Sequence, residues 1–396
     1  MGSLRIHQLF YEGVTVKKKK TESPAPESTA AETAAESGNG QELALEAERA
    51  RRRKKLRHYK RMRFWDRVAG FIIVTVLVVG CFCLGLEYVI VKGPSPALRD
   101  MFITTMNETR RFRFIPRLFL TEAEMAELTK KEETPTDIQA DESLITIAAH
   151  EEIGSGEGDS RTDAYGLVDE DGDGILLLDV KGNGYMGYMT VVLDPKRVFV
   201  GMPDAYGGIG LTLEEMVKKY NAIGGINAGG FKDDGGGGLG GIPEGLTIID
   251  GQCYNSNADT TEGFAGLDKN GILHVGFYTL EECQEKGIVN AVSFGPILIS
   301  NGMPADPPSS SVNPRTAIGQ RADGAILMLV IDGRQVHSTG ATYQDMTDIM
   351  LDYGAVNAIN MDGGSSTVKY YKDRYVNSCS AENGQPRPLP DAWLYK

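Results

Sequence analysis

Asn357-Ala-Ile-Asn-Met-Asp-Gly-Gly-Ser-Ser366 is the stretch around which this sequence is organised. An apolar approach leads into two glycines and two hydroxyl side chains, which predicts a strand followed by a tight turn. Glycine lets a backbone come close to a ligand because it has no Cβ. Binding and catalytic groups concentrate on loops that a rigid scaffold holds. The turn beside Asn360 and Asp362 is therefore the first candidate site, although a plain structural turn would explain the same residues.

The same order of features occurs twice more upstream. In each case a capping box begins a short helical segment, a glycine ends it, and an asparagine follows three residues later. The three units reach Asn227, Asn290 and Asn357. Each unit predicts a helix followed by a strand, and we expect the loops after the three strands to meet in one region.

Turn sequences separate short apolar runs throughout the chain beyond residue 144. Asp268–Gly271, Asn301-Gly302 and Arg321–Gly324 are typical of hairpin turns, and most of the 48 glycines lie in this part of the sequence. Hairpin signals dominate while helices alternate with strands in the second half. The sequence therefore predicts an α+β fold with mixed or antiparallel sheets and several helices, preceded by one N-terminal transmembrane helix.

Residues 70–91 form an apolar run whose one charged residue, Glu87, lies near its end. This length suits a single crossing of a hydrocarbon layer about 30 Å thick. The segment Arg51–Arg63 just before it is rich in Lys and Arg, and the far side is much less basic, so the N-terminus is predicted to be cytoplasmic. Since no signal-peptide cleavage site is present, we expect an uncleaved single-pass anchor in the cell membrane, with the rest of the chain extracytoplasmic.

Four segments follow from these patterns. Residues 1–67 are predicted to be cytoplasmic and largely disordered, with a basic juxtamembrane helix, because their Ser-, Ala-, Glu- and Pro-rich tract buries too little apolar surface to fold. Residues 68–91 are the predicted transmembrane anchor. Residues 92–143 are predicted to form extracytoplasmic juxtamembrane helices, one capped by Thr121–Glu124, and a polar linker. Residues 144–396 are the predicted catalytic domain.

Composition argues against several kinds of site. A formal charge of −13 disfavours a nucleic-acid surface on the main domain, and no Cys/His cluster has zinc spacing. Cys253, Cys283 and Cys379 are an odd number outside the membrane segment, and their pairing stays open. Asp169–Gly174 begins like a calcium loop, but its twelfth position is Val180 instead of a bidentate Glu, so a hairpin turn is favoured there.

One predicted hairpin brings arginines and carboxylates close together. The strand that begins at Pro314-Arg-Thr316 should pair, across the turn at Asp323-Gly324, with a strand that ends in Asp332-Gly-Arg334. Two guanidiniums near two carboxylates suit an oxyanion or phosphate. A plain turn and a structural ion pair remain the alternatives.

These motifs, taken in order, resemble the phosphodiester glycosidase family, uncovering-enzyme-like proteins whose bacterial relatives are often called exopolysaccharide biosynthesis proteins. The motifs that carry the resemblance are Asn227-Ala-Gly-Gly-Phe231, Ser293-Phe-Gly-Pro296 with Asn301-Gly302, Pro314-Arg-Thr316, Asp332-Gly-Arg334 and Asn360-Met-Asp-Gly-Gly-Ser-Ser366. They cover about residues 170–395. The sequence departs from the family pattern at Gly230, where a Phe is usual, and at Asn313, where a His is common, and both departures affect substrate identity more than reaction class.

The resemblance implies hydrolysis of a glycosyl-1-phosphodiester with release of free sugar. Because the departing phosphate monoester is a stabilised anion, cationic donors on the phosphate do much of the work of a general acid. Arg315 and Arg334 would clamp the phosphate, and Asp362 would act as base or nucleophile at the anomeric carbon. Asp332 would position Asp362 or a metal, so the implied catalytic residues are Asp362, Asp332 and Arg315. Substrate binding is expected from Asn227, Gly229, Gly230, Ser293, Gly295, Asn301, Thr316, Arg334, Asn360, Gly363, Gly364 and Ser365.

The expected partners are a sugar-1-phosphodiester or phosphorylated envelope glycan and, through residues 70–91, the lipid bilayer; no nucleic acid is expected. No cofactor is firmly indicated, and a divalent cation stays an open alternative. Two other classes of function fit the same loops. The chain could be a non-catalytic envelope glycan- or sugar-phosphate-binding protein in exopolysaccharide biosynthesis, or a phosphodiesterase that cleaves the P–O bond and releases sugar 1-phosphate.

Overall fold

The structure, a computed structural model, describes most of the chain beyond residue 37. The described residues are 38–95, 98–99, 102–103, 105–106, 114–128, 139–147, 162–204, 206–232, 239–256, 263–307, 311–381 and 384–396. The N-terminal tract before residue 38, predicted to be disordered, and residues 131–138 of the predicted linker lie outside them.

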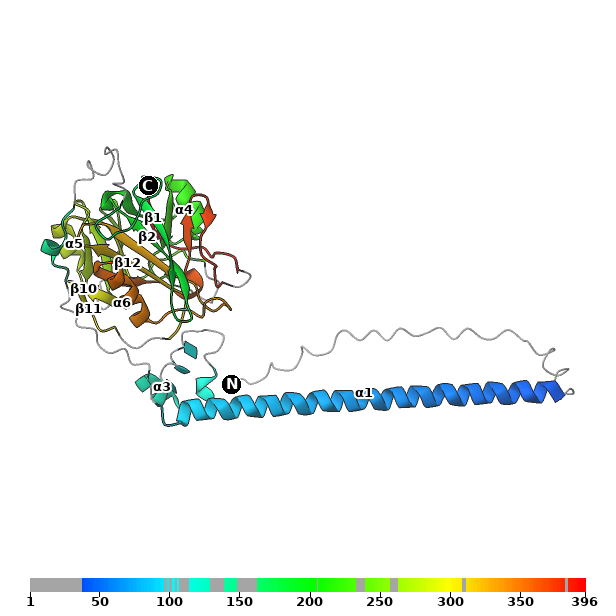
Figure 1. The fold of residues 1–396 in the computed structure, drawn as a ribbon. Coiled ribbons are helices and arrows are strands. Elements are labelled where there is room, and N and C mark those ends of the chain that lie inside the picture. Colours follow the sequence, from blue (N-terminus) through cyan, green and yellow to red (C-terminus); the bar gives the residue numbers. More distant parts are fainter. Residues whose placement is uncertain are drawn as a thin grey trace, which may run out of the picture. The chain divides into compact units, whose positions relative to one another are not determined.

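The chain divides into two compact units, Met1–Gly85 and Leu86–Lys396. A single continuous helix, α1 (Gly38–Lys92), contains both the basic segment and the apolar segment of the N-terminal region (Figure 1). Of the helices in the described part of the chain, α1 is the one long and apolar enough to cross a membrane, and none of its apolar window is buried. It is therefore a candidate membrane span.

Three antiparallel sheets make up most of the second unit, which agrees with the predicted α+β class. The seven-stranded sheet has the order β1-β2-β13-β12-β14-β10-β11. Its strands are β1 (Ile175–Lys181), β2 (Met186–Val192), β10 (Ile297–Ser300), β11 (Met303–Pro304), β12 (Arg315–Arg321), β13 (Ile326–Ile331) and β14 (Ala355–Met361). Every strand pair found in the described residues is antiparallel.

The two smaller sheets have five strands each, in the orders β16-β15-β4-β17-β3 and β6-β5-β9-β7-β8. The strands of the first are β3 (Val198–Gly201), β4 (Gly224–Asn227), β15 (Lys369–Tyr371), β16 (Arg374–Tyr375) and β17 (Ala392–Tyr395). Those of the second are β5 (Leu246–Ile249), β6 (Gln252–Ser256), β7 (Phe264–Asp268), β8 (Leu273–Gly276) and β9 (Ile288–Ser293).

Apart from α1, the α-helices of the described residues are short, with seven to ten residues each. The α-helices of the second unit are α3 (Glu122–Leu128), α4 (Leu213–Tyr220), α5 (Leu280–Lys286) and α6 (Tyr343–Asp352), and the 3-10 turns are η2 (Pro116–Leu118), η3 (Glu142–Leu144), η5 (Pro195–Arg197) and η7 (Gly364–Ser366). The predicted capping boxes at Thr212, Thr279 and Thr342 are all formed. One predicted helix end is wrong: α4 ends at Asn221, in the left-handed conformation that Asn tolerates, and Gly224 already belongs to β4.

The core explains why β13 is a continuous apolar run. Its even-numbered residues from Ile326 to Val330 pack into the core that the three sheets share. Its odd-numbered residues from Leu327 to Ile331 pack into a second core, to which α6 contributes. Because alternate side chains of a strand point to opposite faces, a strand buried on both faces has no polar alternation.

The turn predictions are confirmed in three places and wrong in a fourth. Asn301-Gly302 joins the antiparallel strands β10 and β11. Turns at Asp268–Gly271 and Arg321–Gly324 join β7 to β8 and β12 to β13. Asp169–Gly174 is no hairpin: it is a bend before β1, in which the Asp169 carboxylate accepts the N–H groups of Gly172 and Gly174. Asp side chains often organise local bends in this way, and the sequence signal is the same as for a hairpin turn.

Lys369 provides a test of how the sheets are held together. Its Nζ is fully buried and donates to the Thr190 hydroxyl on β2 (2.6 Å) and the Met328 carbonyl on β13 (2.7 Å). Burial holds the pKa of this amine well below its ordinary value. The folded chain therefore binds fewer protons here than the unfolded chain, and this contribution to stability rises with pH up to the unfolded pKa near 10.4.

We predict that Lys369→Met lowers the slope of unfolding free energy against pH by up to about 1.4 kcal/mol per pH unit between about pH 7 and about pH 9. Urea denaturation of the two proteins across this range measures the slope. Equal slopes would show that Lys369 keeps its proton in the folded state.

Candidate functional site

Asp362 lies where two sheets meet end to end. It follows β14 directly, and its N–H donates to the carbonyl of Ala228, just after β4 (3.0 Å). The Asn227 amide donates to the Asp362 carbonyl (2.6 Å), and its Oδ1 accepts from the Thr316 hydroxyl (2.8 Å) and the Val368 N–H (3.1 Å). Asn227 thus joins β4, β12 and the segment after η7, and it fixes the backbone of Asp362.

The side chain of Asp362 is partly buried and points into a polar turn. Its Oδ1 accepts the N–H of Gly363 (2.9 Å). Burial raises the pKa of this carboxyl to about 6, against the lowering effects of hydrogen bonds from Ser366 and Gly363 and of the Arg387 charge; Glu244 adds to the rise. A carboxyl with this pKa is mostly ionised at neutral pH and titrates just below it.

The turn after Asp362 has two arginines beside it. Gly364 adopts φ +62°, which favours glycine, and its N–H donates to the Pro314 carbonyl (2.9 Å). A Cβ on Gly364 would lie 3.4 Å from Nη2 of Arg334. On the other side, Nη1 of Arg387 lies 3.5 Å from the Ser365 hydroxyl. The Gly364–Ser365 turn is therefore flanked by two guanidiniums.

The three predicted loops do meet at this point. A Cβ on Gly230 would lie 2.9 Å from the Phe294 ring, and the Asn360 amide donates to the Gly295 carbonyl (2.7 Å). The N–H of Gly229 donates to the Asp391 carboxylate (2.7 Å). The expectation that the loops after β4, β9 and β14 lie together is confirmed.

Two of the three repeated asparagines lie away from Asp362 and bind other parts of the backbone. Asn290 accepts the N–H of Val200 (3.1 Å), and Asn357 accepts the N–H of Asn301 (2.9 Å) at the opposite end of β14 from Asp362. The structure also places Asn301, expected to bind substrate, at that far end. Its amide accepts from Asp141 N–H and donates to the Gln139 carbonyl, so it ties residues 139–141 to the sheet.

Arg315, expected to clamp phosphate, is buried in the wall of the fold. Its Nε donates to the Ala341 carbonyl (3.2 Å) and its Nη2 to the Ser311 carbonyl (2.7 Å). Its guanidinium carbon lies 4.2 Å from the centre of the Tyr343 ring. These contacts anchor the loop before β12 to α6.

Asp332 is also buried and bound on both oxygens. Its Oδ1 accepts from the Asn377 amide (3.2 Å) and the Ser378 N–H (3.0 Å), and its Oδ2 lies 3.2 Å from Nε2 of His337. Arg334 on the same loop is exposed and donates to Asn313 Oδ1 through both Nε and Nη2. Asp332 thus orders the two loops that flank the Gly364–Ser365 turn.

The remaining expected residues are assigned by the same contacts. Ser293 accepts the N–H of Leu246 (2.8 Å) and is a structural residue next to the site. The structure brings together Asp362, Asn227, Gly229, Gly230, Gly295, Thr316, Arg334, Asn360, Gly363, Gly364 and Ser365.

Three further charged residues belong to this region and were missed in the sequence. Arg387 lies with its guanidinium carbon 4.5 Å from the centre of the Phe231 ring, and Asp391 and Glu244 lie beside Gly229 and Gly230. Asp391 directly precedes the apolar strand β17, whereas Asp362 directly follows β14, so each carboxylate lies at one end of an apolar strand. A search for polar residues at every apolar strand end would have found Asp391, but no sequence signal marks Glu244.

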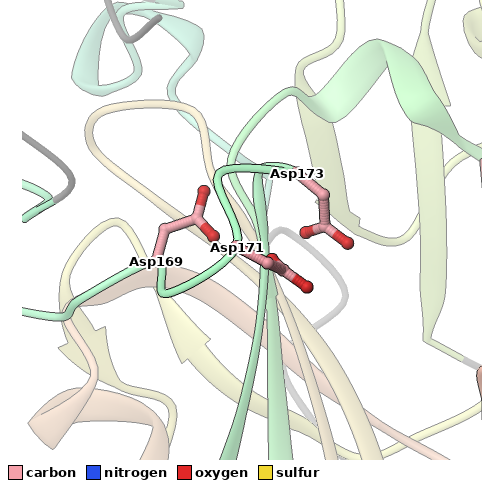
Figure 2. Close-up of side chains that lie close together, drawn as sticks. All are labelled: Asp169, Asp171 and Asp173. Carbon is pink, nitrogen blue, oxygen red and sulfur yellow. The ribbon is translucent and has the colours of Figure 1, made fainter.

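The described residues contain one group of carboxylates with metal-like spacing, and it lies away from Asp362. The ligand oxygens of Asp169, Asp171 and Asp173 all lie within 4.8 Å of one another (Figure 2). The Lys372 amine already binds Asp171 (2.6 Å) and Asp173 (3.1 Å). Lys372 follows β15 at the Gly224 end of β4, whereas Asp362 lies beyond the Asn227 end, so this cluster has no part in the candidate site.

Comparisons with known proteins match the part of the chain that carries the site. Residues 220–396 match the family model described as phosphodiester glycosidase. The SPbeta prophage-derived uncharacterized protein YomE of Bacillus subtilis is 29% identical over 183 residues, which cover 43% of this chain and 27% of that protein. The N-acetylglucosamine-1-phosphodiester alpha-N-acetylglucosaminidases of Bos taurus and Homo sapiens are 26% and 25% identical over 205 residues each, which cover 46% of this chain and 38% and 39% of theirs. The chain thus spans less than half the length of these curated relatives.

Among solved structures, this chain is similar to the catalytic domain of zebrafish N-acetylglucosamine-1-phosphodiester alpha-N-acetylglucosaminidase, auto-inhibited by its pro-peptide. The TM-score is 0.48 and the sequence identity 21%, and the match covers 56% of this chain and 81% of that one. A hypothetical protein from Synechocystis has a TM-score of 0.42 and 14% identity, covering 56% and 62%.

We predict that Asn227→Ala lowers the free energy of unfolding by about 3 kcal/mol or more, because it leaves the Thr316 hydroxyl, the Val368 N–H and the Asp362 carbonyl without their partner. Chemical denaturation measures the loss. Asn183→Ala, at an exposed turn between β1 and β2, is the matched control, and we expect a cost below about 1 kcal/mol. Similar losses in the two variants would contradict the central place of Asn227.

Proposed function

Because residues 220–396 form a domain of the phosphodiester glycosidase family, we propose that this chain hydrolyses a glycosyl-1-phosphodiester and releases the free sugar. One observation carries the proposal: a partly buried carboxylate, Asp362, lies beside a glycine turn that two arginines flank. The carboxylate suits attack at an anomeric carbon, or activation of the attacking water, and the guanidiniums suit the departing phosphate.

The roles follow from where each group lies. Asp362 is held by its backbone and by Gly363, so its carboxylate is pre-oriented for the anomeric centre. Arg387 and Arg334 would bind the phosphate above Gly364 and Ser365, where a backbone without Cβ atoms lets the anion approach. Arg315 and Asp332 support this arrangement as structural residues.

We further propose an N-acetylglucosaminyl phosphodiester as the substrate class, after the activity in the names of the mammalian relatives. The natural substrate would be a phosphorylated glycan of the cell envelope or extracellular space. In this proposal residues 68–91 of α1 anchor the chain in the membrane, residues 1–67 are cytoplasmic, and residues 92–143 connect the anchor to an extracytoplasmic catalytic domain at 144–396. The basic side chains that precede the apolar segment support this orientation.

Product analysis on a panel of sugar-1-phosphodiesters tests the proposed reaction. In water enriched in heavy oxygen, cleavage at the anomeric carbon places the label in the released sugar. Label in the phosphate, with sugar 1-phosphate as product, would identify a P–O-cleaving phosphodiesterase instead. Saturable binding without any product would identify a sugar-phosphate-binding protein.

We predict that Asp362→Asn lowers kcat by about 10²- to 10⁴-fold, because the amide acts neither as base nor as nucleophile. In the wild type, kcat should fall as the pH drops below about 6, since the reactive form of Asp362 is the ionised one. Steady-state kinetics with the phosphodiester that the wild type hydrolyses, measured across this pH range, checks both effects. Asp250→Asn, at an exposed turn between β5 and β6, is the control and should keep wild-type kinetics.

We predict that Arg387→Lys and Arg334→Lys each raise KM for the phosphodiester about tenfold or more, because Lys cannot make the bidentate contact of a guanidinium. The KM of an uncharged aryl glycoside of the same sugar should change much less. Equal effects on both substrates would mean that these arginines do not bind the phosphate.

A further inference from the structure

Asp391 is a buried carboxyl group beside the candidate site to which the proposed reaction gives no role. It is 1% exposed and directly precedes β17. Its Oδ1 accepts the N–H of Gly229 (2.7 Å), whereas its Oδ2, equally buried, meets no hydrogen-bond donor in the described part of the chain. A buried carboxylate oxygen without a donor is costly, so this group needs an explanation.

Strand register places Asp391 next to the residues that fix Asp362. Ala392 pairs with Asn227, so Asp391 lies alongside the Ala228-Gly229 backbone that follows β4. Ala228 in turn accepts the N–H of Asp362. A Cβ on Gly229 would lie 3.2 and 3.3 Å from the two carboxyl oxygens of Asp391, so the carboxyl packs flat on a turn that only glycine leaves open.

The charges near Asp391 make its ionised form unfavourable. The charged group that faces it is Asp362, another carboxylate, while Arg387 and Glu244 act on Asp362. Two buried carboxylates that share a site do not both ionise easily. Burial raises the pKa of Asp391 to about 7; the Gly229 N–H opposes this rise, and the charge of Asp362 adds to it.

We propose that Asp391 is a positioning residue that, as a neutral carboxylic acid, holds the Gly229–Gly230 turn beside Asp362 and leaves the site with one buried negative charge instead of two. The proposal rests on the proposed function, because its consequence depends on an anionic substrate. A phosphodiester carries a negative charge at every pH of interest. Loss of the Asp391 proton adds a second buried negative charge next to the place where this anion must bind.

The proposal determines a pH dependence of binding. In the wild type, KM for the phosphodiester should rise about tenfold, equivalent to about 1.4 kcal/mol, between about pH 6 and about pH 8. The KM of the uncharged aryl glycoside should stay constant over the same range. Asp362, whose pKa is about 6, also gains charge over this range, so the Asp391 contribution is the part of the rise that removal of the Asp391 carboxylate abolishes. A neutral substrate does not sense either charge strongly.

Asp391→Asn is the decisive variant, because its Oδ1 still accepts the Gly229 N–H while the side chain cannot ionise. We expect wild-type KM near pH 6 and a clearly smaller rise by about pH 8 than in the wild type, because only Asp362 still ionises. Asp250→Asn again controls for the removal of a distant carboxylate and should follow the wild type. A phosphodiester KM that rises equally in wild type and Asp391→Asn would overturn the proposal.

An activity-independent measurement separates this proposal from the proposed function. Because the folded pKa of Asp391 lies above its unfolded value near 3.9, the wild type should lose stability relative to Asp391→Asn as pH rises from about 5 to about 8. If the denaturation midpoints of the wild type and Asp391→Asn change in parallel with pH, Asp391 does not carry the proposed proton and the proposal is overturned. If the wild type loses stability relative to Asp391→Asn but KM shows no effect, the proton is purely structural, and this would also overturn the proposal.

A wild type that hydrolyses no glycosyl phosphodiester would remove the proposed function, whatever the stability profiles show. If Asp391→Asn does not fold, infrared difference spectra of the wild type replace it. A carboxylic-acid C=O band should disappear near neutral pH, and Asp362→Asn should shift its disappearance to lower pH by removing the neighbouring charge. An unshifted band, or no band, would overturn the proposal.

Discussion

The hydrogen bonds between Asn227 and the backbone around Asp362 are the constraint on which the rest of this structure depends. β4 and β14 belong to different sheets, and their ends meet because one buried amide donates to the Asp362 carbonyl while accepting from β12 and from Val368. An amide with both a donor and an acceptor end suits this junction, since a carboxylate has no donor for the Asp362 carbonyl and would leave it unpaired in the interior. The position of the reactive carboxylate is thereby coupled to the packing of the sheets.

The site of this fold requires the burial of several polar groups. The Lys369 side chain crosses between two sheets, and burial lowers the pKa of its amine while it raises the pKa values of Asp362 and Asp391. Each of these groups is held by backbone donors or acceptors and not by an opposite charge in direct contact. This pattern leaves the carboxylates reactive, because a tight salt bridge would lower their pKa and occupy their oxygens.

Much of the fold was predictable because its signals are local. Capping boxes at Thr212, Thr279 and Thr342 and the turns after Asp268 and Arg321 depend on residues close together in sequence, and the structure forms all of them. The bend at Asp169–Gly174 was misread since side-chain hydrogen bonds to nearby N–H groups and a hairpin turn use the same residues.

The candidate site was predictable only in part, because its decisive contacts join distant segments. Gly229 to Asp391 and Asn227 to Asp362 are separated by more than a hundred residues, and no local pattern reports such pairs. Asn227 and Asn301 look alike in sequence, each beside glycines near a strand end, yet one lies at each end of the sheets. Arg315 was assigned to phosphate on its proximity to Arg334, and no local pattern reports that its guanidinium donates to the Ala341 and Ser311 carbonyls.

Charge balance explains why a protonated Asp391 suits this site. Arg334 and Arg387 flank the Gly364–Ser365 turn, and Asp362 and Glu244 are carboxylates of the same site. With a neutral Asp391 no further negative charge opposes an anionic phosphodiester, and the guanidiniums nearest to it attract it. An ionised Asp391 adds one negative charge before the substrate arrives, and the low dielectric of a partly buried site increases the repulsion. The unusual burial of a second carboxyl is therefore compatible with an anionic substrate only if that carboxyl keeps its proton.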